Sequence, residues 1–276
     1  MKTFAMIGSA CISLIFFTAH GVEERESSTV QMLRAYHEMN YAAARKLAKA
    51  RPETPESRLI RALCDVYDRR SQDITRGQRE LERIFQDGSL PEPYRIEAGL
   101  ALGRTAQLMK KRRELYGSDA DRYDHLKTLR EVAALAPAGA AGAAAMFYVF
   151  QELLENPETA AVAFTEMEAY LRNFGGDRGL LVPLHLLAEY EYIRLRKDYK
   201  NAVRHLENSC ELGITNPNEA RDALFRLAFL CYKKLGDRKA AGRYFNEYLA
   251  KHRFSGQAVV ARRFLEEMKK EERRNR

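Results

Sequence analysis

The segment FRLAFLCYKKLGDRKAAGRYFNEY, Phe225–Tyr248, decides the fold of this chain. Apolar residues recur at helical spacing before Gly236, and a second stripe that includes Ala241 and Phe245 follows Asp237. The glycine suits the end of one helix, and the aspartate suits the cap of the next. The segment therefore predicts two helices that are joined by a tight turn.

A pattern from this segment recurs along the chain. An Asp or Asn caps a helix, an Ala four residues later allows close helix approach, and a residue four further on fills the groove on the same face. The starts of successive copies lie 33 to 46 residues apart, close to the period of a two-helix unit. The full copies are Asn40–Ala44–Ala48, Asn156–Ala160–Phe164, Asp198–Ala202–Leu206 and Asp237–Ala241–Phe245; Asp73–Gly77–Leu81 is weaker, and Asp119–Tyr123–Lys127 fits only by position.

Periodicity and punctuation by Pro, Ser and Gly predict thirteen helices and an all-α fold. No short run alternates polar and apolar residues with β-branched enrichment, so no strand is expected. The predicted helices cover about 29–38, 41–50, 55–70, 75–87, 91–114, 119–135, 138–155, 157–173, 179–196, 199–212, 218–235, 237–252 and 255–272.

The chain resembles tetratricopeptide-repeat proteins of the bacterial cell envelope. In that family an aromatic residue, a turn Gly, an Ala and a second aromatic residue occupy the places of Tyr232, Gly236, Ala241 and Phe245. The resemblance in helical arrangement extends over most of the chain, and the repeats within residues 179–265 match the family best. It implies an α-solenoid over 29–272, with about six stacked antiparallel helical hairpins plus a C-terminal capping helix. It also implies a binding scaffold.

Residues 1–21 are typical of a secretory signal peptide. Lys2 is followed by an uncharged apolar stretch, and Ala19 and Gly21 place small residues where signal peptidase requires them. We expect export to the periplasm or cell envelope, cleavage after Gly21, a short linker at 22–28 and a tail at 273–276. An uncleaved N-terminal anchor, or a lipoprotein at Cys11, remains an alternative, and membrane attachment is expected only through this segment.

Composition excludes several other classes of protein. Among 276 residues, 46% are apolar and only 8 are Pro, which argues against a disordered chain. The formal net charge of +8 falls to +7 without residues 1–21, whose one charged side chain is Lys2. The basic residues lie at helix ends and in a mixed-charge tail, so no nucleic-acid partner is expected.

Three cysteines remain in the predicted mature chain. Cys64, Cys210 and Cys231 lie in apolar helical surroundings and are interpreted as buried free thiols. A Cys210–Cys231 bridge is left open, because sequence does not give the distance between them.

The sequence contains no phosphate-binding loop, nucleophile elbow or zinc-binding spacing. His185 and Glu189 share a helix face, but a second ligand pair is missing, so an ordinary surface or capping pair is the preferred interpretation. Residues 119–124 lack the glycine of a calcium loop and are interpreted as an acidic helix start. We therefore expect no catalytic residues, no metal and no cofactor.

Three tyrosines, Tyr190, Tyr192 and Tyr199, are the candidates for a partner-binding surface, with packing within the repeats as the alternative. The small-residue run 136–145 is read as tight helix packing, and a ligand groove there is the alternative. The residues that we expect to pack the repeats are Ala44, Ala160, Phe164, Ala202, Leu206, Tyr232, Gly236, Ala241 and Phe245.

These observations favour an exported, non-catalytic scaffold that binds a protein or peptide partner at the cell envelope. One alternative is a component of an envelope assembly complex that docks through its C-terminal repeats. Another is an enzyme or glycan-binding module that uses the less regular region 91–150.

Overall fold

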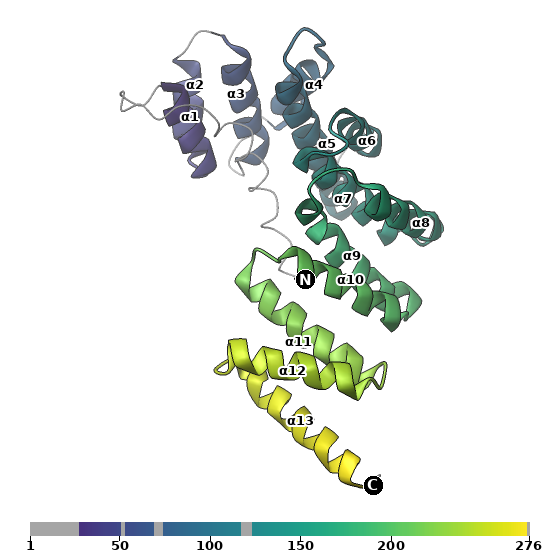
Figure 1. Cartoon of the computed structure of the whole chain (residues 1–276). Coiled ribbons are helices and arrows are strands. Elements are labelled where there is room, and N and C mark those ends of the chain that lie inside the picture. The colour runs from purple at the N-terminus through teal and green to yellow at the C-terminus, as the bar shows by residue number, and fades with distance from the viewer. Residues whose placement is uncertain (1–27, 51–52, 69–73, 117–122, 275–276) are drawn as a thin grey trace. The chain divides into compact units, whose positions relative to one another are not determined.

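The computed structural model describes residues 28–50, 53–68, 74–116 and 123–274 (Figure 1). Within these residues the chain forms thirteen α-helices and no strand, which confirms the all-α prediction. The predicted signal peptide and most of the predicted linker lie outside the described residues. The chain divides into two compact units, Met1–Val149 and Phe150–Arg276, which are described separately.

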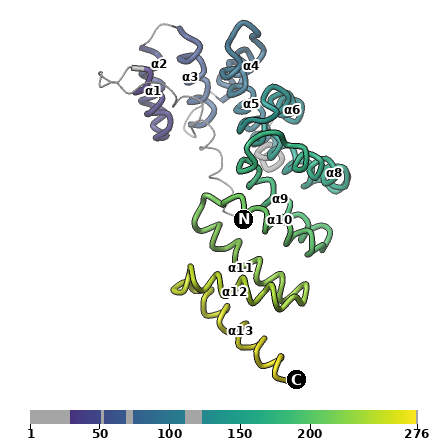
Figure 2. Tube along the Cα trace, in the orientation of Figure 1, coloured from purple at the N-terminus to yellow at the C-terminus, as the bar shows by residue number. Residues whose placement is uncertain are grey.

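Unit 1 holds six helices and most of a seventh. Neighbouring helices pack together: α1 against α2, α3 against α4, and α5 against both α4 and α6 (Figure 2). The division between the units falls inside α7. The helices are α1 (Ser28–His37), α2 (Tyr41–Lys49), α3 (Pro55–Tyr67), α4 (Ile74–Gln86), α5 (Glu92–Tyr116), α6 (His125–Leu135) and α7 (Ala140–Glu155).

Unit 2 contains the remaining six helices. Packing again links sequence neighbours: α9 with α10, α10 with α11, α11 with α12, and α12 with α13. The helices are α8 (Pro157–Asn173), α9 (Val182–Glu191), α10 (Tyr199–Leu212), α11 (Pro217–Lys233), α12 (Arg238–His252) and α13 (Gly256–Arg274). Helix α13 runs into the predicted tail.

The predicted caps are confirmed. The side chains of Asn40, Asn156, Asp198 and Asp237 each accept a hydrogen bond from a backbone N–H in the first turn of the following helix, at 3.2, 3.0, 3.1 and 2.9 Å. Such a cap is worth about 1 kcal/mol. The positional copy at Asp119 lies outside the described residues, and α6 is capped instead by Asp124.

The small residue that follows each cap is buried, as expected. Ala44, Ala202 and Ala241 have no exposed surface, and Ala160 is 7% exposed. In the weaker copy Gly77 replaces Ala, and a Cβ built there would lie 2.8 Å from Asp65 Cβ and 2.9 Å from the backbone oxygen of Ala62. Helices α3 and α4 are therefore too close at this point for any side chain.

The turn between α11 and α12 follows the sequence prediction. Gly236 has a φ of +67°, which L side chains rarely adopt. The backbone N–H of Asp237 donates to the oxygen of Cys231 at 2.9 Å across this turn. Around it, Phe225 packs against both Phe245 and Tyr248, with ring centroids 5.9 and 5.4 Å apart.

Two predicted helices differ from the structure. The helix expected over 119–135 begins at His125. The helix expected over 179–196 is a 3₁₀ turn at Arg178–Leu181, then α9, then a π-helical turn at Tyr192–Arg196. Lys197 ends that turn in a left-handed conformation, with a φ of 53°.

Candidate functional site

The three tyrosines predicted as a binding surface do not share one face. Tyr190 is 54% exposed, whereas Tyr192 is only 4% exposed. Tyr199 is half-buried, and the Lys234 ammonium lies 5.1 Å from its ring centroid. Residues two apart on a helix point in different directions, so Tyr190 and Tyr192 were never able to line one surface together. Tyr192 is thus corrected to a core residue.

Tyr192 belongs to a partly buried polar network, the Glu168 cluster, which consists of Glu168, His185, Tyr192, Arg204 and His205. One oxygen of Glu168, Oε1, lies 2.7 Å from Tyr192 Oη, 2.8 Å from Arg204 Nη2 and 2.8 Å from His205 Nε2. His205 Nδ1 then lies 2.9 Å from His185 Nδ1. The Tyr192 ring also stacks on His205, with centroids 5.4 Å apart.

The two histidines connect the carboxylate of this cluster to a buried nitrogen atom. His205 Nε2 lies 2.8 Å from a Glu168 carboxylate oxygen, which can only accept, and 3.0 Å from Arg204 Nη2, which can only donate. One of the two facing Nδ1 atoms of His205 and His185 donates to the other, and His185 Nε2 takes no part in this hydrogen bond. That nitrogen is buried and has no hydrogen-bond partner.

Burial and hydrogen bonding set the pKa values of the cluster. Burial raises the pKa of Glu168, but hydrogen bonds from His205 and Tyr192 outweigh burial and bring this pKa to about 2. Burial lowers the pKa of His185 to about 4, with neighbouring His205 and Arg178 acting in the same direction. The cluster therefore holds an anionic carboxylate beside a neutral histidine.

The suggested pairing of His185 and Glu189 on a surface is wrong. His185 is 2% exposed and Glu189 is 3% exposed. Glu189 accepts two hydrogen bonds from the Arg226 guanidinium, at 3.2 and 3.0 Å. Across the described part of the chain, no group of three or more His, Cys, Asp or Glu is arranged to hold a metal ion.

A second cluster lies in unit 1 and is called here the α5 face: Tyr36 of α1, Tyr67 of α3, Glu97 and Arg104 of α5, and Tyr148 of α7. Glu97 and Arg104 are seven residues apart, which places them two turns apart on one side of the helix. The Arg104 Cζ lies 5.8 Å from the Tyr67 ring centroid and 5.5 Å from that of Tyr148. Two rings from separate helices thus flank one guanidinium.

Glu97 is unusual for a nearly buried carboxylate. It is 7% exposed, and none of the described residues lies within hydrogen-bond or ion-pair distance of its side chain. Burial raises the pKa of Glu97 to about 7, and the charge of Arg104 offsets part of this rise. The side-chain oxygens of Glu97 are not among the polar atoms that are fully shielded from solvent and lack a partner. These oxygens therefore keep a small contact with solvent.

Arg104 also lacks a carboxylate partner. Among the described residues, no Asp or Glu oxygen lies within 4.0 Å of its guanidinium, whereas Arg45, Arg58 and Arg76 in the same unit all form ion pairs. The side chain is half-buried. On the α5 face, Arg104 therefore hydrogen-bonds the Tyr67 side chain and lies near two tyrosine rings, instead of forming an ion pair.

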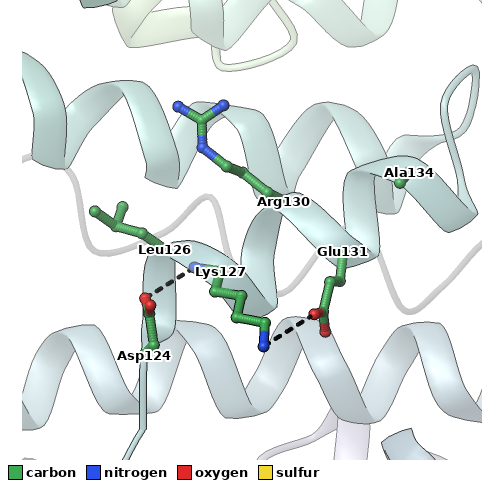
Figure 3. Close-up of a pocket in the computed structure, with 6 residues that line it drawn as sticks. All are labelled: Asp124, Leu126, Lys127, Arg130, Glu131 and Ala134. Carbon is green, nitrogen blue, oxygen red and sulfur yellow. Dashed lines mark hydrogen bonds and ion pairs between the residues drawn. The ribbon is translucent and has the colours of Figure 1, made fainter.

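A surface hollow of about 530 Å³ lies over α6 (Figure 3). Its lining comes from this helix and its cap: Asp124, Leu126, Lys127, Arg130, Glu131 and Ala134. Asp124 accepts from the Lys127 backbone N–H at 2.9 Å, and the Lys127 ammonium lies 3.9 Å from Glu131 Oε1. Groups that sit along one helix do not converge on a common point, so this hollow is a poor active-site candidate.

The three described cysteines form no disulfide in the structure. Burial raises the pKa of Cys64 to about 12 and that of Cys231 to about 11. Cys210 packs against the same apolar cluster as Cys231. The pKa of the Cys210 thiol is also raised by burial, so all three thiols are protonated at neutral pH and are weak nucleophiles. The interpretation of buried free thiols is confirmed for Cys64 and Cys231, whereas Cys210 is a free thiol that is only half-buried.

Neither cluster was identified from the sequence. A usable signal existed for the α5 face, because Glu97 and Arg104 are the two charged residues within the otherwise uncharged segment 96–109. The Glu168 cluster had no such signal, since its members come from α8, α9, the π-helical turn and α10. Only packing brings them together.

No protein-family model matches the chain, and no curated protein sequence matches it significantly. Within the described residues, no helix has the length and apolar character needed to cross a membrane.

Proposed function

We propose that this chain is an exported, non-catalytic helical-repeat scaffold that binds a segment of another protein at the cell envelope. The repeated module of cap, small residue and apolar residue supports a stack of helical hairpins, which is the solenoid that the tetratricopeptide resemblance implies. In such a stack each unit contacts its neighbours and leaves an extended surface for a partner.

The observation that carries the proposal is the position of Arg104 between Tyr67 and Tyr148. The three residues come from α5, α3 and α7, which are not consecutive helices. All three side chains are partly exposed. Arg and Tyr are the residue types most often found at the energetic centre of protein interfaces, because they combine large apolar area with hydrogen-bonding groups.

Affinity capture with the full exported chain, followed by binding to an array of peptides from the captured protein, tests the proposal. We expect saturable binding of a peptide segment, reduced by Arg104→Ala. Arg243→Ala is the matched control, because Arg243 also lies over a tyrosine ring, that of Tyr244 at 4.5 Å, but in unit 2. Failure to bind any segment, together with a small molecule that raises the melting temperature, would favour the enzyme or glycan-binding alternative.

The export part of the proposal has its own test. The mature protein should begin at Val22 when its mass is measured after secretion in a bacterial host. Ala19→Arg should block the cut, because the peptidase accepts only small side chains at that position. An intact N-terminus in the membrane fraction would indicate the anchor, and a lipid-sized mass increase on a chain beginning at Cys11 would indicate the lipoprotein.

A further inference from the structure

We propose that one edge of unit 2, formed by the turns 194–200 and 233–239 and called here the basic edge, binds the surface of an anionic lipid bilayer. This contact goes beyond the proposed binding of a protein segment, and it is separate from the predicted attachment through residues 1–21. The basic edge holds eight Lys or Arg residues and only two acidic residues, Asp198 and Asp237.

The two turns of the basic edge lie side by side. Turn 194–200 leads from the π-helical turn into α10, and turn 233–239 joins α11 to α12. Both turns lie on the same side of the helices of unit 2 (Figure 1). The Lys234 ammonium lies 5.1 Å from the ring centroid of Tyr199, which is the first residue of α10. The charges of both turns are therefore gathered at one edge.

Most of the cations on this edge are exposed and have no acidic partner. Three of the eight form ion pairs, and these are Arg194, Lys233 and Arg238. The other five are exposed, with no carboxylate oxygen within 4.0 Å among the described residues; they are Arg196, Lys197, Lys200, Lys234 and Lys239. Asp198 and Asp237 are already engaged, because they accept hydrogen bonds from the first turns of α10 and α12. The edge therefore keeps an excess of positive charge that faces solvent.

Three of these cations occupy places where they oppose local stability. Lys200 and Lys239 are each the second residue of their helix, and neither α10 nor α12 has an acidic residue in its first turn. Because a helix N-terminus carries partial positive charge, a cation is unfavourable there. Lys197 has a φ of 53°, a left-handed conformation that the next turn gives to Gly236. Cations at three unfavourable places indicate a requirement other than folding.

Each turn also exposes a leucine among its basic residues. Leu195 is 38% exposed and Leu235 is 40% exposed. Leucines beside Lys and Arg suit the boundary between lipid headgroups and acyl chains, where apolar area is buried while the cations lie near phosphates. The two turns project at helix ends, and a bilayer surface can contact such an edge along its whole length. This favours a lipid surface over an acidic protein segment.

The test measures binding of the full exported chain to lipid vesicles that are separated by sedimentation. Vesicles of phosphatidylcholine with about 30% phosphatidylglycerol should bind the chain at least about tenfold more tightly than vesicles of phosphatidylcholine alone, at roughly 0.1 M salt. Raising the salt to about 0.5 M should release the chain, because screening weakens the attraction between the cations and the anionic surface.

Variants then locate the contact. The double variant Lys200→Gln with Lys239→Gln should bind the anionic vesicles at least about tenfold more weakly, because each cation near such a surface contributes roughly fivefold. Its melting temperature should stay the same or rise, since two cations are removed from helix N-termini. The matched control, Arg253→Gln with Arg262→Gln, removes the same charge at the other end of α12 and should change binding by less than about twofold.

Two further variants separate binding from folding. Lys197→Gly removes a cation and relieves a left-handed conformation, so binding should weaken about fivefold while the melting temperature rises. Leu195→Ser with Leu235→Ser leaves the charge unchanged and should weaken binding by at least about fivefold in total, through the loss of apolar contact.

The remaining outcomes would overturn the inference. Equal weakening by the two double variants would show only the general attraction of a basic protein, without a specific edge. Equal binding to neutral and anionic vesicles would show that the basic edge is not the contact. Binding of polyglutamate without binding of anionic vesicles would indicate an acidic protein partner instead of a lipid surface. The scaffold function is tested independently by Arg104→Ala, so either proposal can fail without the other.

Discussion

Glu97 shows how one buried acidic residue can oppose folding. Burial raises its pKa to about 7, so the folded chain holds a proton that the unfolded chain releases near the ordinary pKa of 4.5. An acid with a raised folded pKa makes the folded state less stable as pH rises through this window. The penalty is complete above pH 7 and absent below about 4.5.

The first prediction is that Glu97→Gln stabilises the chain at pH 8 by roughly 1–3 kcal/mol, because a shift of one pKa unit corresponds to about 1.4 kcal/mol. At pH 4.5 the substitution should have little effect. Urea unfolding followed by circular dichroism at both pH values measures the difference. Glu247→Gln, which removes an exposed ion pair with Lys251, is the control and should change stability by no more than about 0.5 kcal/mol at either pH. Equal effects of Glu97→Gln at both pH values would contradict the raised pKa.

Tyr192 is a residue whose role in the structure differs from the one that the sequence predicted. Its hydroxyl donates to Glu168, and its ring lies between Phe164 and His205, with centroids 4.9 and 5.4 Å away. A residue that was predicted for an exposed surface is instead buried and completes a partly buried polar network. The reason is its position, since the π-helical turn begins at Tyr192 and directs this side chain inward.

At the scale of elements, two glycines near the start of α12 have different physical roles. Gly236 lies in the turn with a φ of +67°, where an L side chain is strained. Gly242 lies inside α12, and a Cβ built there meets no heavy atom within 4 Å. Glycine in a helix interior is less favourable than alanine because it loses more backbone freedom on folding.

The second prediction therefore compares alanine substitutions at these two glycines. Gly236→Ala should lower the free energy of unfolding by about 1 kcal/mol, and Gly242→Ala should raise it by roughly 0.5–1 kcal/mol. Thermal melts of the two variants beside the wild type measure both effects. An unchanged or higher stability of Gly236→Ala would show that the turn does not require the left-handed conformation.

At the scale of the whole molecule, the two units contain titrating groups whose effects on stability change with pH in opposite directions. Glu97 makes unit 1 more stable as pH falls from 7 towards 4.5. In unit 2 the folded pKa of His185 is lowered to about 4, so stability is lost as pH falls below its ordinary value of 6.5. Burial raises the pKa of Glu189 and Glu191, which act against His185.

The third prediction is that acidification from pH 7.5 to pH 5 decreases amide protection in α9 and α10 and increases it in α5. Hydrogen-exchange mass spectrometry of the full chain measures both, after correction for intrinsic exchange rates. His185→Gln should reduce the loss in α9 and α10, and Glu97→Gln should abolish the gain in α5. If the protection of both regions changes in the same direction in the wild type, the opposed clusters do not control local stability.

The sequence by itself determined the all-α class, nearly every helix boundary, the four Asp or Asn caps and the buried small residues that follow them. These features depend on interactions within about four residues, which a sequence pattern records directly. The wrong start at 119–135 and the interrupted helix at 179–196 arose where competing local caps and a π-helical turn changed the backbone.

Only the tertiary structure decided which polar groups meet. The Glu168 cluster joins residues up to 37 positions apart, and Arg104 contacts rings on two other helices. Likewise, only packing places Glu189 against Arg226. Pairing and burial depend on distances between helices, and a periodic pattern along one helix contains no information about the neighbour that covers it.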